Sequence, residues 1–553
     1  MAALLDIFGF LSVLLRAATL VFEALTVGGV IFRFAIAPGS KAGARRGLTQ
    51  CLVFSAGLLA GVQIAYVVAN SALLMASTGL AWGEVMGAEF CISGALIVAG
   101  AAIVAVFASG EPLEGAGRIA CPIDSVLILC GAVMSSHSMA RLEHRWVLIA
   151  LTLVHHLAGD AWIGGMPYLV LSLRREPDPV LAGRFSRLAL FSVMALAGAG
   201  AAMSAFYIGS VGALTGTAYG IMVLAKAFLT GVVVLLGALN RRALQRLATD
   251  GVERLAALRA GPLRAGLIAG FLRLRRFAEV EAGIGITILL AAASLTSSPP
   301  AIDVQAARVR LSEMADRMAP RWPRMETPRV TELSPATPLP SNLSSSMPGS
   351  FVPGEQIQPQ KPADIAWSEY NHHWAGLIVG VIGLLSLAAR RAAWARHWPL
   401  AFLGLAVFLL VRADSENWPL GPRGFWESFQ VAEVAQHRLF VLLIVAFAAV
   451  EWRVQTSRVL MERASLVFPA VCAVGGALLL THSHSLGNVK EAFLVELSHL
   501  PLAIFAVMAG WSRWLEIRVS TDQNQLSLRH VAPWVWPVCF ILIGAILMNY
   551  REA

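Results

Sequence analysis

The sequence predicts an all-α fold, a polytopic transmembrane helical bundle of about 14 spans, and three observations support that class. Of the 553 residues, 57% are hydrophobic and 14% are charged, whereas soluble domains are typically about 25% charged. The apolar runs reach the roughly 20 residues that a helix needs to cross the hydrocarbon layer. Inside lipid, only helices and closed barrels satisfy every backbone hydrogen bond, and runs of this length favour helices.

The predicted spans form a group of eight and a group of six, separated by a stretch of different composition. Residues 299–366 are rich in Pro and Ser, and such a stretch buries too little apolar surface to fold alone. We therefore predict an eight-helix membrane domain at 1–298, an extracytoplasmic linker at 299–366 and a six-helix membrane domain at 367–553. The spans are expected near residues 7–36, 48–76, 88–109, 119–140, 146–173, 186–208, 219–239, 279–296, 370–390, 398–412, 435–452, 464–481, 493–512 and 533–549.

Basic residues gather in the loops that follow odd-numbered spans, and this pattern predicts the orientation. Arg174 and Arg175 follow the fifth span, and Arg390 and Arg391 follow the ninth. Basic loops stay on the cytoplasmic side, so both termini are predicted to be extracytoplasmic, in a bacterial inner (cytoplasmic) membrane. The same topology explains the net charge of +9, and nucleic acid is therefore not an expected partner.

Four stretches of the first half are typical, in this order, of a known family. They are HHLAGDAWIGGMPYLVLSLRR at 155–175, RFSRLALFSVMALAGAG at 184–200, GALTGTAYGIMVLAKAFLTGVVVLLGALNRR at 212–242 and VEAGIGITILLAAASLTSSPPA at 280–301. Through them the chain resembles the copper resistance D (CopD) family of integral membrane proteins over about residues 1–300. The resemblance implies a role in moving or handling copper at the inner membrane, in a direction that it does not settle.

The resemblance also implies four candidate residues. His155, His137, Lys226 and Glu281 stand at positions that match the family's histidines, lysine and glutamate. Ser136 stands where the family usually has a glycine before the second of these histidines, which weakens that match.

Ionisable residues inside the predicted spans point to function without any resemblance. At the centre of a span such a residue costs about 2.5–3.5 kcal/mol on insertion scales, so it usually faces protein or water. Lys226 is expected to pair with Glu281 or Glu23, and the alternative is that these charges only fix helix packing. His155 and His156 are expected within reach of His137 and His144, which would make one place for a metal to enter. The intramembrane candidates are Arg16, Glu23, Asp160, Lys226 and Glu281.

Six histidines of the second half all fall at the predicted external side. Imidazole is a suitable ligand for copper, so they predict a metal site, with His437 and His499 as the first candidates. Glu433 lies four residues before His437 and Glu496 three before His499, on the same helix faces, where a carboxylate can orient the ring. The alternative is that interfacial histidines only cap helices. The full set is His372, His373, His437, His482, His484 and His499.

Three functions remain open. The first is copper transport or copper handling, with the copper ion as cargo. The second is a b-type haem-binding membrane redox protein, because histidines on facing helices can ligate haem axially. The third is a scaffold that delivers copper to another envelope protein, such as a periplasmic copper-binding protein, through the linker. The sequence has no phosphate loop, no G-x-S-x-G and no H-E-x-x-H, so an enzyme of those classes is not expected.

Overall fold

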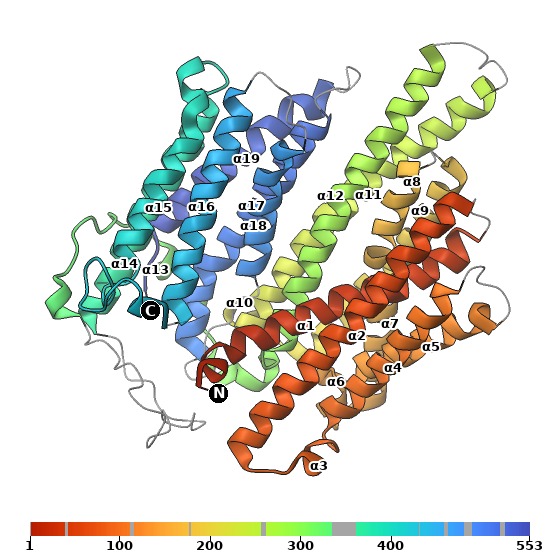
Figure 1. The fold of residues 1–553 in the computed structure, drawn as a ribbon, viewed down its shortest axis with the longest axis horizontal. Helices are drawn as coiled ribbons and strands as arrows, with labels where there is room; N and C mark the ends of the chain where they lie inside the picture. The colour runs from red at the N-terminus through yellow and green to blue at the C-terminus, as the bar shows by residue number, and fades with distance from the viewer. Residues whose placement is uncertain are drawn as a thin grey trace. The chain divides into compact units, whose positions relative to one another are not determined.

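The computed structural model describes residues 2–552 except 39–41, 111–115, 176–177, 256–261, 334–360, 431, 458–462, 481–488 and 520–525 (Figure 1). Throughout this part of the chain the regular elements are helices, and the only pairing of extended residues there is an isolated bridge between Asn417 and Arg423. The predicted all-α class is confirmed.

Twelve helices within the described ranges are long and apolar enough to cross a membrane, so this is a multi-pass membrane protein. Two further predicted spans, near 119–140 and 464–481, are present as shorter apolar helices at Ile119–Met134 and Ala464–Leu479. The predicted number of fourteen spans is therefore not confirmed by length and composition. The twelve are Leu11–Ile36, Arg45–Thr78, Glu89–Ser109, Arg145–Arg175, Pro179–Ile208, Ala218–Gln245, Gly270–Thr296, Pro362–Ala388, Ala393–Arg412, His437–Thr456, Phe493–Val519 and Val531–Met548.

The chain divides into two compact units. Unit 1 comprises residues 1–8, 215–221 and 304–553, and unit 2 comprises residues 9–214 and 222–303. The first half of the chain contains the helices α1 (Ala2–Ile31), η1 (Phe32–Ile36), α2 (Ala42–Thr78), α3 (Trp82–Val85), α4 (Glu89–Ser109), α5 (Ala116–Met134), α6 (His137–Ala140), α7 (Arg145–Gly159), η2 (Asp160–Gly164), α8 (Met166–Arg175), α9 (Pro179–Ile208), α10 (Val211–Gly216), α11 (Ala218–Leu255), α12 (Pro262–Thr296) and η3 (Ala301–Ala307).

In unit 2, α4 packs between α2 and α5, α7 packs on α9, and α8 packs on α12. The π-helical turn η2 joins α7 to α8 within one span and lies against α1. There the backbones approach so closely that a Cβ on Gly164 would lie 1.8 Å from the Ala24 carbonyl oxygen, and one on Gly28 would lie 2.2 Å from that of Asp160. Small residues allow such contacts between membrane helices. Gly164 thus allows α1 and the span that contains η2 to approach closely.

The second half of the chain builds most of unit 1. Helices α14 and α19 are in close contact through glycines, since a Cβ on Gly376 or Gly544 would lie 2.7 or 2.6 Å from the facing backbone. An aromatic core that includes Trp398, Phe468 and Trp536 holds the other helices. The elements are α13 (Leu311–Met318), η4 (Val330–Glu332), α14 (Pro362–Ala388), η5 (Ala393–Leu400), α15 (Ala401–Arg412), η6 (Glu427–Gln430), α16 (Ala432–Thr456), η7 (Ala464–Leu466), α17 (Val467–Leu479), α18 (Val489–Val519) and α19 (Leu526–Met548).

Part of the predicted linker packs on the helices of unit 1. Glu313 of α13 forms an ion pair with Lys490 at 2.7 Å, and Arg324 forms one with Glu369 of α14 at 3.1 Å. Residues 334–360, which hold most of the Pro and Ser, lie outside the described residues. The three-part domain division and the docking role of the linker stay predictions.

Candidate functional site

Two groups of polar residues stand out, one in each unit. In unit 2 the first contact joins α1 to α7, where His156 Nδ1 lies 2.9 Å from Glu23 Oε1. The Glu23 side chain is only 2% exposed, so the His156 imidazole takes the place of water as its hydrogen-bond partner. The close packing at Gly28 and Gly164 sets that spacing, because it brings α1 against the span that carries His156.

His155 and Asp160 each bring an unsatisfied polar atom to the same region. His155 Nδ1 and Asp160 Oδ2 are buried and have no hydrogen-bond partner among the residues that the structure describes. Asp160 begins the π-helical turn, and Glu23 is an electrostatic neighbour of its carboxyl group. π-Helical turns occur frequently at functional sites, and unsatisfied buried atoms usually signal a bound water or ion, or a chemical role. The glycine at position 200 leaves room for the His155 ring, whose Cε1 would be 3.3 Å from a Cβ there.

Lys226 does not form the predicted pair with Glu281 or Glu23. Glu281 accepts a hydrogen bond from Asn240 of α11, and Glu23 is bound by His156. Lys226 lies fourteen residues before Asn240 on the same helix, about 21 Å along its axis, so it cannot reach Glu281. It is instead an electrostatic neighbour of His155. Among the residues that the structure describes, no carboxylate forms an ion pair with Lys226.

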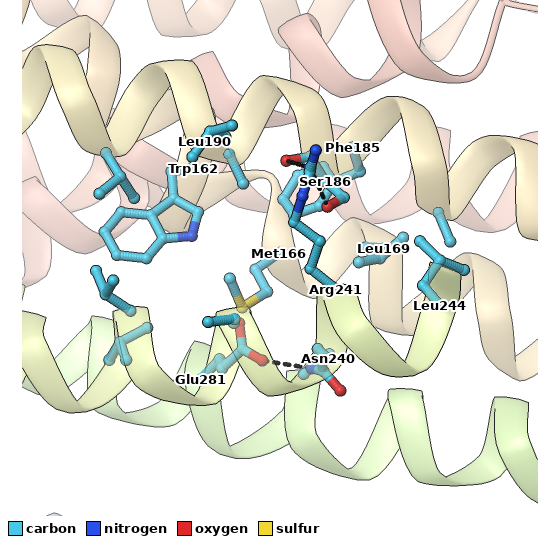
Figure 2. Close-up of a pocket in the computed structure, with 18 of the residues that line it drawn as sticks. Trp162, Met166, Leu169, Phe185, Ser186, Leu190, Asn240, Arg241, Leu244 and Glu281 are labelled. Carbon is cyan, nitrogen blue, oxygen red and sulfur yellow. Dashed lines mark hydrogen bonds between the residues drawn. The ribbon is translucent and has the colours of Figure 1, made fainter. Parts of the chain in front are cut away.

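A cavity of about 170 Å³ lies in unit 2 beside Glu281 (Figure 2). Its walls are mostly apolar side chains from η2, α8, α9, α11 and α12. Trp162 and Met166 line one part of it, and the Asn240–Glu281 hydrogen bond lies along another (Figure 2). At the same cavity, Arg241 donates to Ser186 Oγ at 3.1 Å. The Glu281 carboxylate is thus the acidic group of this mostly apolar space.

The prediction that His155 lies within reach of His144 is wrong. His144 caps α7, and eleven residues of helix separate it from His155, about 16 Å. His137 lies beside Tyr207, with the ring centroids 6.3 Å apart, and burial lowers the pKa of His137.

Arg16 donates to Ser135 Oγ at 2.9 Å and to the Ser135 carbonyl at 2.7 Å, so Arg16 binds the chain just after the C-terminal end of α5.

In unit 1, two predicted ligands come together near the C-terminal end of α19. The rings of His372 and His499 have centroids 6.3 Å apart, and Tyr550 stacks on His372 at 3.8 Å. His372 Nδ1 donates to the Ser368 carbonyl at 2.8 Å, and His499 Nδ1 donates to the Val495 carbonyl at 2.9 Å. Each neutral ring therefore carries its lone pair on Nε2, the arrangement that metal-binding histidines usually adopt.

Tyr550 is a residue of this site that sequence reasoning missed. Burial raises the pKa of its phenol, which donates to Glu552 Oε2 at 2.9 Å. It lies beyond the last span, where no helical spacing relates it to His372. Only the return of α19 to α14 brings the two together.

His373 has a structural role. Its Nδ1 accepts from the Arg324 backbone N–H at 2.7 Å, and its Nε2 donates to the Tyr550 carbonyl at 2.9 Å. Both ring nitrogens are thus engaged, and the ring is buried. His373 cannot bind a metal without breaking one of these bonds.

His437 has an acidic partner, although not the predicted one. Its Nδ1 lies 2.8 Å from Asp414 Oδ1, on the segment after α15. The Glu433 side chain, like His482 and His484, lies outside the described part of the structure. Glu496 is half-buried on α18, and the bond that orients His499 goes to the backbone of α18 instead of to this carboxylate.

Within the described ranges, no group of three or more His, Cys, Asp or Glu side chains is placed to hold a metal ion. The structure therefore provides pairs: His372 with His499 and His437 with Asp414 in unit 1, and His156 with Glu23 in unit 2. An ion that used the pairs would need further ligands from water, from a second molecule or from a rearrangement.

Comparison with known proteins gives a partial match. Residues 179–295 match the family model of copper resistance protein D, which confirms the resemblance in that part of the chain. The copper transport protein CutJ of Bacillus subtilis (strain 168) is 29% identical over 179 residues, which are 31% of this chain and 29% of that protein. The chain thus spans less than a third of that relative's length in the match. No solved structure matches it significantly.

Proposed function

We propose, from the premise that residues 179–295 are similar to copper resistance protein D, that this membrane protein moves or handles copper at a bacterial inner membrane. The match is the observation that carries the proposal. It covers α9, α10, α11 and α12 except the last residue of α12. Of these helices, α11 bears Lys226 and α12 bears Glu281, and α9, α11 and α12 line the cavity of unit 2. The chain acts as a carrier of copper and not as an enzyme.

The histidine pair of unit 1 is the proposed place where copper is collected. His372 and His499 point their Nδ1–H groups at backbone carbonyls, so Nε2 is the nitrogen that would bind the ion. Imidazole suits copper in either oxidation state. By the charge pattern of the loops, this end of unit 1 faces the extracytoplasmic side. His437, oriented by Asp414, is a second imidazole at the same predicted side.

Haem does not fit this histidine pair. A porphyrin bound by both imidazoles would lie between their rings. The Tyr550 ring lies against that space, with its centroid 3.8 Å from that of His372 and 5.8 Å from that of His499. We therefore favour copper over the haem alternative here.

The first prediction concerns copper binding to the purified protein. Replacing both His372 and His499 by alanine is expected to remove tight copper binding at the collection site, because the two imidazoles are its proposed ligands. The measurement is copper retained per protein after dialysis against a competing chelator, together with copper accumulation in cells that express each variant.

His397→Ala is the matched control. This histidine accepts a hydrogen bond from Trp452 at 2.9 Å and lies after the ninth predicted span, on the predicted cytoplasmic side. It should leave copper retention unchanged. Equal retention by the double variant and wild type would contradict the collection site, and unchanged accumulation with and without the protein would contradict the proposed function as a whole.

A further inference from the structure

The cavity of about 170 Å³ in unit 2 has polar groups at one level and apolar walls deeper in the membrane (Figure 2). At the polar level, Arg241 of α11 donates to Ser186 of α9, and Glu281 of α12 is bound by the same turn of α11. Val193 lines the cavity seven residues beyond Ser186, about 10 Å along α9. Val233 lines it eight residues before Arg241, about 12 Å along α11. By the charge pattern of the loops, Arg241 lies near the cytoplasmic end of its span, so both valines lie farther into the hydrocarbon layer.

Arg241 and Glu281 carry opposite charges beside this cavity without pairing with each other. Arg241 is half-buried, and Glu281 is only 5% exposed. Over the residues with described positions, neither side chain forms an ion pair, although both have hydrogen-bond partners. An unpaired charge inside a membrane protein is unfavourable. A ligand that brings both an anion and a cation would therefore pair both groups.

We infer that the cavity binds a zwitterionic phospholipid with a primary ammonium group, such as phosphatidylethanolamine. The Arg241 guanidinium has five N–H donors, and its Nη1 is the nitrogen that donates to Ser186, so it can also donate to phosphate oxygens. The ammonium group of the lipid donates to the Glu281 carboxylate, and one acyl chain enters beside Val193 and Val233. Lipid binding here goes beyond the proposed copper function and does not depend on it.

The cavity has an apolar opening through which a lipid chain can enter. Leu190 of α9 and Val234 of α11 line it and are 43% and 38% exposed. Exposed apolar side chains of a membrane span contact lipid tails, which are equally apolar. An apolar cavity of about 150 Å³ is large enough for benzene, so this one holds only part of a chain. The rest of the lipid lies in the bilayer outside the opening.

The two charges predict which headgroup is selected. Phosphatidylcholine has no N–H on its quaternary ammonium group, so it offers Glu281 no hydrogen bond. Phosphatidylglycerol has no cation, and its phosphate would lie near a carboxylate that stays unpaired. Phosphatidylethanolamine is therefore expected to bind more tightly than either lipid with the same acyl chains.

Native mass spectrometry of the purified full-length protein tests this selection with the three dioleoyl lipids. The wild type should bind phosphatidylethanolamine about tenfold more tightly than phosphatidylcholine, the factor expected for one hydrogen bond to a charged group. Glu281→Gln keeps an acceptor for Asn240 but removes the charge, so this preference should be lost. Arg241→Gln should weaken binding of phosphatidylethanolamine, whereas Arg242→Gln, at the exposed neighbour outside the cavity lining, should not. Equal binding of the three lipids by the wild type would overturn the site.

A phosphatidylethanolamine with a photoactivatable diazirine on its acyl chain locates the bound lipid. In the wild type, label is expected on the segments of α9 and α11 that contain Val193 and Val233. Ala189→Phe adds a ring at the cavity wall and should abolish this labelling, whereas Ala197→Phe, at an exposed position of α9, should not. Label confined to other helices of the wild type would overturn the site, and so would undiminished labelling of Ala189→Phe.

Discussion

Gly164→Ala is expected to lower the stability of unit 2 more than alanine at any other glycine of that unit. The new Cβ would lie 1.8 Å from the Ala24 carbonyl oxygen and 2.4 Å from the Ala24 carbonyl carbon. Backbone atoms cannot rotate away as a side chain can, so α1 and the η2 turn must separate. Overpacking of a well-packed core costs about 1–3 kcal/mol and sometimes more, and we expect a value at the upper end or beyond.

The measurement is the midpoint of thermal unfolding in detergent. Unfolding is monitored through the reactivity of the Cys121 thiol, which is buried in unit 2. Gly183→Ala on α9 is the matched control, because nothing lies within 4 Å of its new Cβ. It should raise or preserve stability, since alanine favours helix over glycine by up to about 1 kcal/mol. Equal midpoints for the two variants would show that α1 and η2 are not in the contact described.

The same separation should break the contact between Glu23 and His156. Gly164→Ala moves Glu23 of α1 away from His156, so any protein that still folds should lose the 2.9 Å contact.

Arg438→Met is expected to have the largest effect in unit 1. Arg438 on α16 is 4% exposed, and its guanidinium donates to the Leu410 carbonyl at 2.7 Å and to the Trp418 carbonyl at 2.6 Å. Methionine keeps apolar volume but supplies no donor, so two carbonyls near the end of α15 lose their partner. Each buried acceptor left unsatisfied costs about 1–3 kcal/mol.

Arg453→Met is the control for this change. It lies in the last turn of the same helix and is exposed, and exposed substitutions usually change stability by less than about 0.5 kcal/mol. Unfolding midpoints of the two variants should therefore differ clearly. A small effect of Arg438→Met would mean that the segment after α15 does not depend on this arginine.

The positions of the spans could be predicted because each depends on a local property. An apolar run of sufficient length is helical in lipid whatever surrounds it, so predictions such as 88–109 and 186–208 fall on α4 and α9. The predicted pairing of Lys226 was wrong, because pairing depends on depth along the helix as well as on charge. Asn240 lies at the depth of Glu281, and Lys226 lies four turns away.

The sequence by itself determined the all-helical membrane fold and the similarity to copper resistance protein D, since these follow from composition, run length and order. Only the tertiary structure decided which groups meet: Glu23 with His156, His372 with His499 and Tyr550, and His437 with Asp414. The physical reason is that helix periodicity fixes neighbours within a helix, whereas contacts between helices depend on their rotation and depth. Those are set by close backbone packing at residues such as Gly28 and Gly164.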